Sequence, residues 1–261
     1  ILRTMKKHHA ITIVTGASRG LGLGMALELL QRGHRVLTLQ RSPSPALQEE
    51  AARLGATLEQ WTVDLTRPQE AAARLRAWVQ ALPRQDIGAL SLINNAALLV
   101  EPCPLAEADD AAVAAAMRAS LEAPLVLTGA FLGASADLAV PRKVLNISSG
   151  LGRFAMAGSA VYCAAKAGLD HFSRAVALEE AERPHGAKIV SLAPGVIDTD
   201  MQVQLRQADP ARFSSQGRFA GLKAQGQLDR IDSAAAKVLA CLEAEDFGQQ
   251  VILDVRDLAG R

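Results

Sequence analysis

Short runs of branched aliphatic residues alternate along this chain with longer stretches of helical periodicity. A run of four to seven apolar residues without polar alternation is typical of a strand that is covered on both faces. Strands that alternate with helices indicate βαβ units joined by right-handed crossovers. We therefore expect an α/β fold with a doubly wound parallel sheet in three αβα layers.

The same pattern gives the expected elements. Seven segments have strand character: 11–15, 35–40, 57–63, 89–93, 143–147, 188–192 and 250–254. Six segments have helical character: 21–31, 45–54, 68–81, 108–133, 160–182 and 233–244. We find no repeat and no Pro/Gly/Ser-rich linker, so we expect a single domain over residues 11–257. Residues 1–10 are interpreted as an N-terminal extension, with Met5 as a candidate start.

Charge and composition exclude several kinds of partner. The 28 Lys and Arg residues are balanced by 27 Asp and Glu residues, and aromatic residues make up 3% of the chain. Nucleic-acid or anionic-membrane binding therefore has no electrostatic basis. We find no run of the roughly 18 apolar residues that a membrane span needs. We expect neither a nucleic-acid nor a membrane partner.

The cysteines and histidines do not form a recognisable framework. Cys103, Cys163 and Cys241 are far apart and odd in number, which argues against a disulfide scaffold and for a reduced, cytoplasmic setting. The five histidines have no cysteine or carboxylate partners at ligand spacing, so we expect no metal site.

A glycine-rich turn follows the first expected strand. Residues 15–22 read Thr-Gly-Ala-Ser-Arg-Gly-Leu-Gly, and a helical stretch begins at once. Glycines let the backbone approach a pyrophosphate closely, and a helix N-terminus offers free N–H groups and the positive end of its dipole. In this strand–turn–helix context the motif predicts a Rossmann-like dinucleotide site; the alternative is a tight turn without a ligand.

The end of the second strand predicts which dinucleotide binds. A carboxylate there would hold the ribose 2′-hydroxyl of NAD, but this chain has Gln40 and Arg41. Arg19 adds a second cation within the glycine turn. Two guanidinium groups suit a 2′-phosphate, so the pattern favours NADP(H). The alternative is that one or both arginines are simply solvated.

Two further strand ends are candidates for cofactor contacts. Asp64, followed by Leu65, comes after the third strand and could accept from the adenine amino group. Residues 94–97, Asn-Asn-Ala-Ala, end the fourth strand, where side-chain amides can tie neighbouring strands together. Either segment alone could be an ordinary turn.

The candidate catalytic group is centred on Tyr162, the single tyrosine in the chain. Lys166 follows four residues later, so both lie on one face of the expected helix. A nearby ammonium favours the phenolate, and we therefore expect Lys166 to lower the pKa of Tyr162. Ser149 ends the fifth strand, at the sheet edge where the ligand crevice of such folds lies. A buried tyrosine beside a snorkelling lysine is the structural alternative.

Taken together, residues 15–22, 94–97, Ser149, Tyr162-xxx-Lys166 and Pro194-Gly195 resemble the motifs of the short-chain dehydrogenase/reductase superfamily, in order and spacing, over residues 10–200. A narrower likeness over residues 145–257 is to sepiapterin reductases and bacterial benzil reductases. It rests on residues 162–167, 193–202 and 247–257.

The resemblance implies a role for each matching residue. Tyr162 would donate a proton to the substrate carbonyl, Lys166 would lower the Tyr162 pKa and bind the nicotinamide ribose, and Ser149 would orient the carbonyl. Ile197 and Thr199 would hold the carboxamide and pyrophosphate. The full cofactor set is Gly16, Ser18, Arg19, Gly20, Leu21, Gly22, Arg41, Asp64, Leu65, Asn95, Ala96, Tyr162, Lys166, Ile197 and Thr199.

Two positions depart from the superfamily pattern. Ser120 stands where an asparagine is expected to support a water relay to the lysine; we keep it as a candidate catalytic residue that could still hold a water. Ala97 replaces a glycine, for which we expect a local effect on the pocket wall.

The substrate side is less constrained. Residues 199–229 are polar and glycine-punctuated, so we expect a substrate loop, with a solvated helical excursion as the alternative. Apolar Leu98, Leu151 and Met201 are expected near the crevice, together with Ser149 and Tyr162. In sepiapterin reductases an acidic residue anchors the pterin, and Asp254 falls at that position; it could equally be the polar end of the last strand.

These observations predict an NADPH-dependent carbonyl reductase that acts on a bulky ketone or α-diketone, of the sepiapterin or benzil kind. Two alternatives remain open: an NADP(H)-binding regulatory or sensor protein with little turnover, and an NAD-dependent alcohol dehydrogenase. The Ala-rich stretches 108–133 and 160–182 form the dimer interface in many superfamily members, so the resemblance implies a homodimer or homotetramer.

Overall fold

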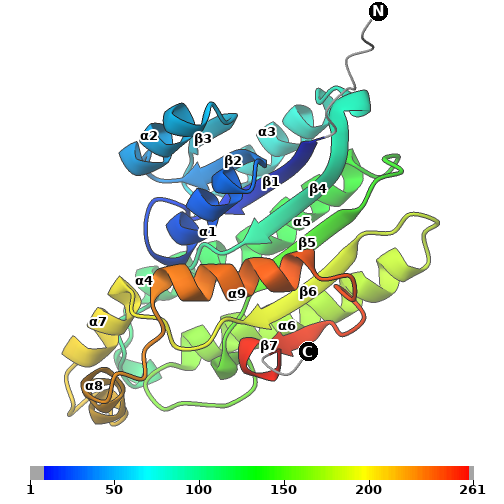
Figure 1. Ribbon diagram of the computed structural model, residues 1–261. Helices are drawn as coiled ribbons and strands as arrows, with labels where there is room; N and C mark the ends of the chain where they lie inside the picture. The colour runs from blue at the N-terminus through cyan, green and yellow to red at the C-terminus, as the bar shows by residue number, and fades with distance from the viewer. Residues whose placement is uncertain (1–8, 259–261) are drawn as a thin grey trace, which may run out of the picture.

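The computed structural model describes residues 9–258 and forms one parallel sheet between two layers of helices (Figure 1). In the described residues the strand order is β3-β2-β1-β4-β5-β6-β7. Its strands are β1 (His9–Thr15), β2 (Arg35–Gln40), β3 (Leu58–Thr62), β4 (Ile87–Asn94), β5 (Arg142–Ile147), β6 (Lys188–Ala193) and β7 (Ile252–Asp254). The expected doubly wound, Rossmann-like fold is confirmed, and the order reverses between β1 and β4.

Two helical layers cover the sheet. The helices are α1 (Gly20–Gln31), α2 (Pro45–Leu54), α3 (Pro68–Gln80), α4 (Asp110–Met117), α5 (Ala123–Ala134), α6 (Ala160–Ala181), α7 (Asp200–Gln207), α8 (Gln216–Ala224) and α9 (Ile231–Glu243). One core cluster lies under α1, α2 and α9, and the other under α3, α5 and α6. Val36 points into the first and Leu37 into the second, as the alternating faces of a doubly covered strand require.

Most elements begin and end within two residues of the prediction, and β2 and α2 match it. The first strand begins at His9, so His9 and Ala10 belong to the sheet rather than to the expected extension. Residues 1–8 of that extension lie outside the described residues.

The long helix expected over residues 108–133 is instead two helices joined by a π-helical turn, Arg118–Glu122. Pro124 in the first turn of α5 has no N–H group to donate to the carbonyl of Ser120. The α-helical hydrogen bond to the Ser120 carbonyl is therefore missing, and a wider π-helical turn replaces the α-helical turn at this point. This interruption sets the position of Ser120 beside the segment that leaves β4.

By length and composition, the described helical stretch Asp110–Ala134 would be long and apolar enough to cross a membrane. In this fold Leu127 and Phe131 are fully buried in the core cluster on the α3 side of the sheet. An apolar face buried in the core is typical of a packed helix.

The segment 199–229 is helical, as its alternative interpretation had it, rather than the loop that was first expected. It forms α7 and α8, which lie beyond the carboxyl ends of the strands, marked by the arrowheads in Figure 1. Phe213 is fully buried and stacks on Phe219 with ring centroids 5.8 Å apart, and Leu205 joins this small core. The polar, glutamine-rich composition favoured a loop because these helices have no continuous apolar face. A few aromatic contacts hold them in place instead.

Candidate active site

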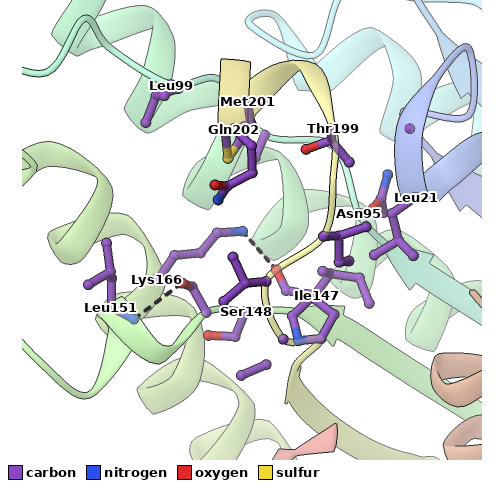
Figure 2. A pocket seen from close by; sticks show the side chains of 18 of the residues that line it. Leu21, Asn95, Leu99, Ile147, Ser148, Leu151, Lys166, Thr199, Met201 and Gln202 are labelled. Carbon is purple, nitrogen blue, oxygen red and sulfur yellow. Dashed lines mark hydrogen bonds between the residues drawn. The ribbon is translucent and has the colours of Figure 1, made fainter. Parts of the chain in front are cut away.

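A cavity of about 1970 Å³ opens at the carboxyl ends of the strands, between the glycine turn and α7. Every predicted cofactor and substrate residue lines this cavity. Of the predicted catalytic residues, Ser149, Tyr162 and Lys166 line it and Ser120 does not. Figure 2 shows Lys166, Ile147 and Ser148 on one side, with Met201 and Gln202 reaching in from α7. The crevice of a doubly wound sheet thus collects residues that are far apart in the sequence.

The glycine turn has the shape of a phosphate-binding loop. A Cβ atom on Gly22 would lie 2.2 Å from the Gly16 carbonyl oxygen, and Gly16 has φ +69° with the Ala96 backbone close behind it. Among the described residues no side chain caps the N-terminus of α1 at Arg19, whereas Ser44 caps α2. A closely packed backbone ending in uncapped helical N–H groups fits the pyrophosphate of a dinucleotide.

Asparagines join the turn to the neighbouring strands. The Thr15 hydroxyl accepts from the backbone N–H groups of Asn95 (2.9 Å) and Ala96 (3.0 Å), and Asn95 Nδ2 donates to the Thr15 carbonyl at 3.0 Å. Asn94 Nδ2 donates to Asn146 Oδ1 at 2.8 Å between β4 and β5. These bonds fix the ends of β1, β4 and β5 relative to one another beneath the cavity.

The end of β2 presents an amide and a cation. Gln40 Nε2 donates to Gln60 Oε1 at 2.6 Å, and the Gln60 amide is itself held by both backbone groups of Ser44. Arg41 is exposed at the cavity edge. The other expected cation, Arg19, forms an exposed ion pair with Asp200 of α7 at 3.0 Å. Since such a pair is weak in water, a phosphate dianion could replace Asp200 there.

Asp64 faces the cavity after β3. The backbone N–H and the hydroxyl of Thr66 both donate to Asp64 Oδ1, at 2.9 Å and 2.8 Å, and these bonds lower the pKa of the Asp64 carboxyl. The carboxylate is therefore ionised at neutral pH and can accept from a ligand amino group.

Tyr162 and Ser149 interact across the end of β5. Burial raises the pKa of the Tyr162 phenol, and a hydrogen bond with Ser149 opposes this shift. Ser149 Oγ also accepts from the Leu151 N–H at 3.2 Å, which leaves its own proton free to donate. The pair therefore offers two O–H donors to one oxygen atom in the cavity.

Lys166 is almost fully buried, and its Nζ donates to the Ile147 carbonyl at 2.7 Å (Figure 2). Burial lowers the pKa of Lys166 to about 8, and the charge of Asp170 opposes the shift. The ammonium lies 5.6 Å from the centre of the Tyr162 ring. Desolvation dominates the pKa of the Tyr162 phenol in this structure, and the expected lowering of that pKa by Lys166 stays a prediction.

Ser120 is buried and its hydroxyl is already engaged. Its Oγ accepts from the Leu98 N–H at 3.0 Å and donates to the Leu98 carbonyl at 3.4 Å. The serine thus holds the segment after β4 against the π turn. The relay role expected for Ser120 stays a prediction, and these two bonds compete with it.

The part of the cavity where the substrate was expected has an apolar lining that also contains charged residues. Its apolar residues are Leu98, Leu151 and, from α7, Met201. Asp254 lies there too, but both of its carboxylate oxygens accept from Arg256, at 2.8 Å and 2.6 Å. These bonds lower the pKa of the Asp254 carboxyl, which is ionised and paired at neutral pH.

Sequence reasoning missed three polar residues near the site. Gln202 of α7 reaches into the cavity, and its buried Oε1 has no hydrogen-bond partner among the described residues (Figure 2). The buried Asp170 and the half-buried Arg153 form an ion pair behind Lys166. The i,i+4 spacing of Lys166 and Asp170 was a usable signal, whereas nothing in the sequence placed Arg153 or Gln202.

This fold, with a glycine turn and a Tyr–Lys pair at one crevice, defines a nucleotide-dependent oxidoreductase. The chain belongs to the short chain dehydrogenase family, whose model matches residues 10–210. It is 31% identical to a benzil reductase ((S)-benzoin forming) of Bacillus cereus over 93% of this chain and 98% of that protein. It is 33% identical to the sepiapterin reductase of Mus musculus, over 95% and 97%. A crystal structure of a short-chain dehydrogenase/reductase from Burkholderia vietnamiensis is 34% identical, with a TM-score of 0.64 and coverage of 96% and 99%.

Proposed function

We propose that this protein is an NADPH-dependent carbonyl reductase that converts a bulky ketone or α-diketone to the alcohol. The observation that carries the proposal is the shared cavity in which Ser149, Tyr162 and Lys166 face the glycine turn. The direct test is NADPH oxidation in the presence of a panel of aromatic diketones and ketones. Turnover with none of them, at a protein concentration that binds NADPH, would contradict the proposal.

In the proposed mechanism, Tyr162 donates its proton to the substrate oxygen while Ser149 holds that oxygen through a second hydrogen bond. Bound NADPH supplies the hydride. Proton donation leaves a phenolate, and the positive charge of Lys166 stabilises it. The raised pKa of Tyr162 keeps the phenol protonated at neutral pH, which suits a general acid in the direction of reduction.

The preference for NADPH rests on the end of β2. Gln40 is neutral and its amide is tied to Gln60, so no carboxylate stands ready for a ribose 2′-hydroxyl at this position. Arg41 lines the cavity beside it. We propose that Arg41, with Arg19 after release from Asp200, binds the 2′-phosphate.

Replacing Arg41 by alanine is expected to raise the KM for NADPH at least about tenfold and to leave the KM for NADH nearly unchanged, because the phosphate loses a charged partner. Steady-state kinetics with both cofactors measure this. Arg174→Ala, at an exposed position of α6 outside the cavity lining, is the control and should change neither KM. An unchanged cofactor ratio in Arg41→Ala would remove the proposed phosphate contact.

For the substrate we favour a benzil-like diketone over a pterin. A pterin that used Asp254 would have to displace Arg256 from both carboxylate oxygens, whereas a neutral aromatic diketone would need only the apolar wall. We expect benzil to have a kcat/KM at least about tenfold above that of sepiapterin. Equal or reversed values would overturn this preference and assign Asp254 to substrate binding.

The pKa of Lys166 predicts the pH dependence. With a value of about 8, the ammonium is present below pH 8 and lost above it, so kcat/KM for reduction should be flat in the neutral range and decline above about pH 8. Lys166→Arg keeps its charge at higher pH and should lose this decline even if its rate is low. A decline that is unchanged in Lys166→Arg would assign it to another group.

We propose that the protein is a cytoplasmic homodimer or homotetramer without nucleic-acid or membrane partners. An NADP(H) sensor would bind the cofactor without oxidising it in the diketone panel. An NAD-dependent alcohol dehydrogenase would prefer NAD and the alcohol in the same assays.

A further inference from the structure

Behind the cavity, the buried carboxylate of Asp170 forms an ion pair with the half-buried Arg153, against the helix that carries Lys166. Asp170 is one helical turn after Lys166 on α6 and is 2% exposed. Arg153 Nε donates to Asp170 Oδ2 at 3.2 Å, and the Ser191 hydroxyl of β6 donates to Asp170 Oδ1 at 2.6 Å. The mechanism proposed above uses neither member of this pair.

The turn that carries Arg153 is fixed to α6. A Cβ atom on Gly152 would lie 3.0 Å from the backbone of Lys166 and 3.1 Å from Asp170 Oδ2, so this turn packs directly on the two residues. The same 3₁₀ turn begins after Ser149. The Arg153 guanidinium is therefore linked to Ser149 by a short covalent segment and to Lys166 by the direct packing of Gly152.

Arg153 also reaches the substrate end of the cavity. Its Nη2 donates to the Leu253 carbonyl at 2.9 Å, and its Nη1 lies 3.9 Å from Asp254 Oδ2. Asp254 is held in turn by Arg256. The result is a line of alternating charges, from Lys166 through Asp170 and Arg153 to Asp254.

We propose that Asp170 and Arg153 are positioning residues that set the electrostatic field at Lys166 and connect it to Asp254. This inference rests on the proposed function for its catalytic meaning. Lys166 is buried beside two neutral groups, the Tyr162 phenol and the Ile147 carbonyl, and its ammonium needs an anion nearby to persist at neutral pH. Asp170 on the same helix supplies that anion, and Arg153 from the packed turn partly offsets it. At the end of β7, Asp254 is paired with Arg256 of the following turn, which opposes its charge.

The test uses variants with opposite expected effects. Asp170→Asn keeps the shape and removes the negative charge, so the pKa of Lys166 should fall by roughly one pH unit. Arg153→Gln removes the offsetting cation, so the pKa should rise above that of the wild type. Ser191→Ala removes a hydrogen bond to Asp170 without removing a charge and is the matched control, with a much smaller shift expected.

The readout is a pH titration of the Lys166 side chain by NMR, on the full chain labelled with ¹⁵N-lysine, with Lys166→Arg for assignment. The decline of kcat/KM at high pH should move with the measured pKa in each variant. An unchanged pKa in Arg153→Gln, or a shift in Asp170→Asn no larger than in Ser191→Ala, would overturn the proposal.

This titration separates the inference from the proposed function because it needs no turnover. The Lys166 pKa could shift in opposite directions in Asp170→Asn and Arg153→Gln while the protein reduces no carbonyl. That result would support the proposed role of Asp170 and Arg153 and contradict the proposed reductase activity. If Asp170→Asn does not fold, Arg153→Gln alone still tests the proposal through the expected rise in the Lys166 pKa. A pair with a purely structural role would leave that pKa unchanged.

Discussion

Tyr162→Phe is expected to lose nearly all carbonyl reduction and to keep NADPH binding. The substitution removes one oxygen atom, which is the proton donor and one of the two O–H groups facing the substrate oxygen. Loss of a positioned general acid costs about a hundredfold to ten-thousandfold in rate. Single-turnover kinetics should show this loss in the chemical step, while fluorescence titration gives a Kd for NADPH close to that of the wild type.

The control for Tyr162→Phe is Cys163→Ala at the next position of α6. Cys163 lies outside the cavity lining, and its thiol faces the Phe154 carbonyl at 3.9 Å, so turnover should change little. Normal rates in Tyr162→Phe would refute the assigned chemistry. A parallel loss of NADPH binding would instead point to a structural role for the phenol.

Gly22→Ala is expected to abolish cofactor binding and to destabilise the protein. The added Cβ would lie 2.2 Å from the Gly16 carbonyl oxygen of the turn and 2.5 Å from Asn95 Nδ2, which holds the turn through hydrogen bonds to Thr15 and Gly16. Overpacking of this kind costs about 1–3 kcal/mol in the free energy of unfolding, and relief of the contact would move the backbone that faces the pyrophosphate. Calorimetric titration with NADPH and urea unfolding measure the two effects.

Gly217→Ala on α8 is the matched control for Gly22→Ala. No heavy atom lies within 4 Å of a Cβ built on Gly217 among the described residues, and alanine favours the helix. Its unfolding free energy should be equal or slightly higher, with unchanged NADPH binding. If Gly22→Ala behaved in the same way, the close packing of the turn would not be what shapes the binding site.

Local patterns in the sequence predicted the scaffold because each pattern reports one element. Continuous apolar runs identified strands such as β2, and helical periodicity from Pro45 onward identified α2. The glycine turn and the Tyr162–Lys166 spacing depend on backbone freedom and helical period, which are also local properties. The cavity lining therefore contains nearly every residue that these motifs predicted.

The sequence did not indicate contacts between distant segments. Helices α7 and α8 were expected only as the alternative to a loop, because Phe213 and Phe219 are buried by each other and by residues far away in the chain. The hydroxyl of Ser120 is taken by Leu98, 22 residues earlier, and Arg19 is paired with Asp200, 181 residues later.

The sequence by itself determined the sheet, the glycine turn and the side chains proposed to react, since these follow from short-range periodicity and spacing. Only the tertiary structure decided how the reacting groups ionise. Burial raises the Tyr162 pKa and lowers that of Lys166, and the charges of Asp170 and Arg153 reach the site from separate elements. Desolvation and long-range charge depend on what surrounds a group in space, which the order of residues along the chain does not specify.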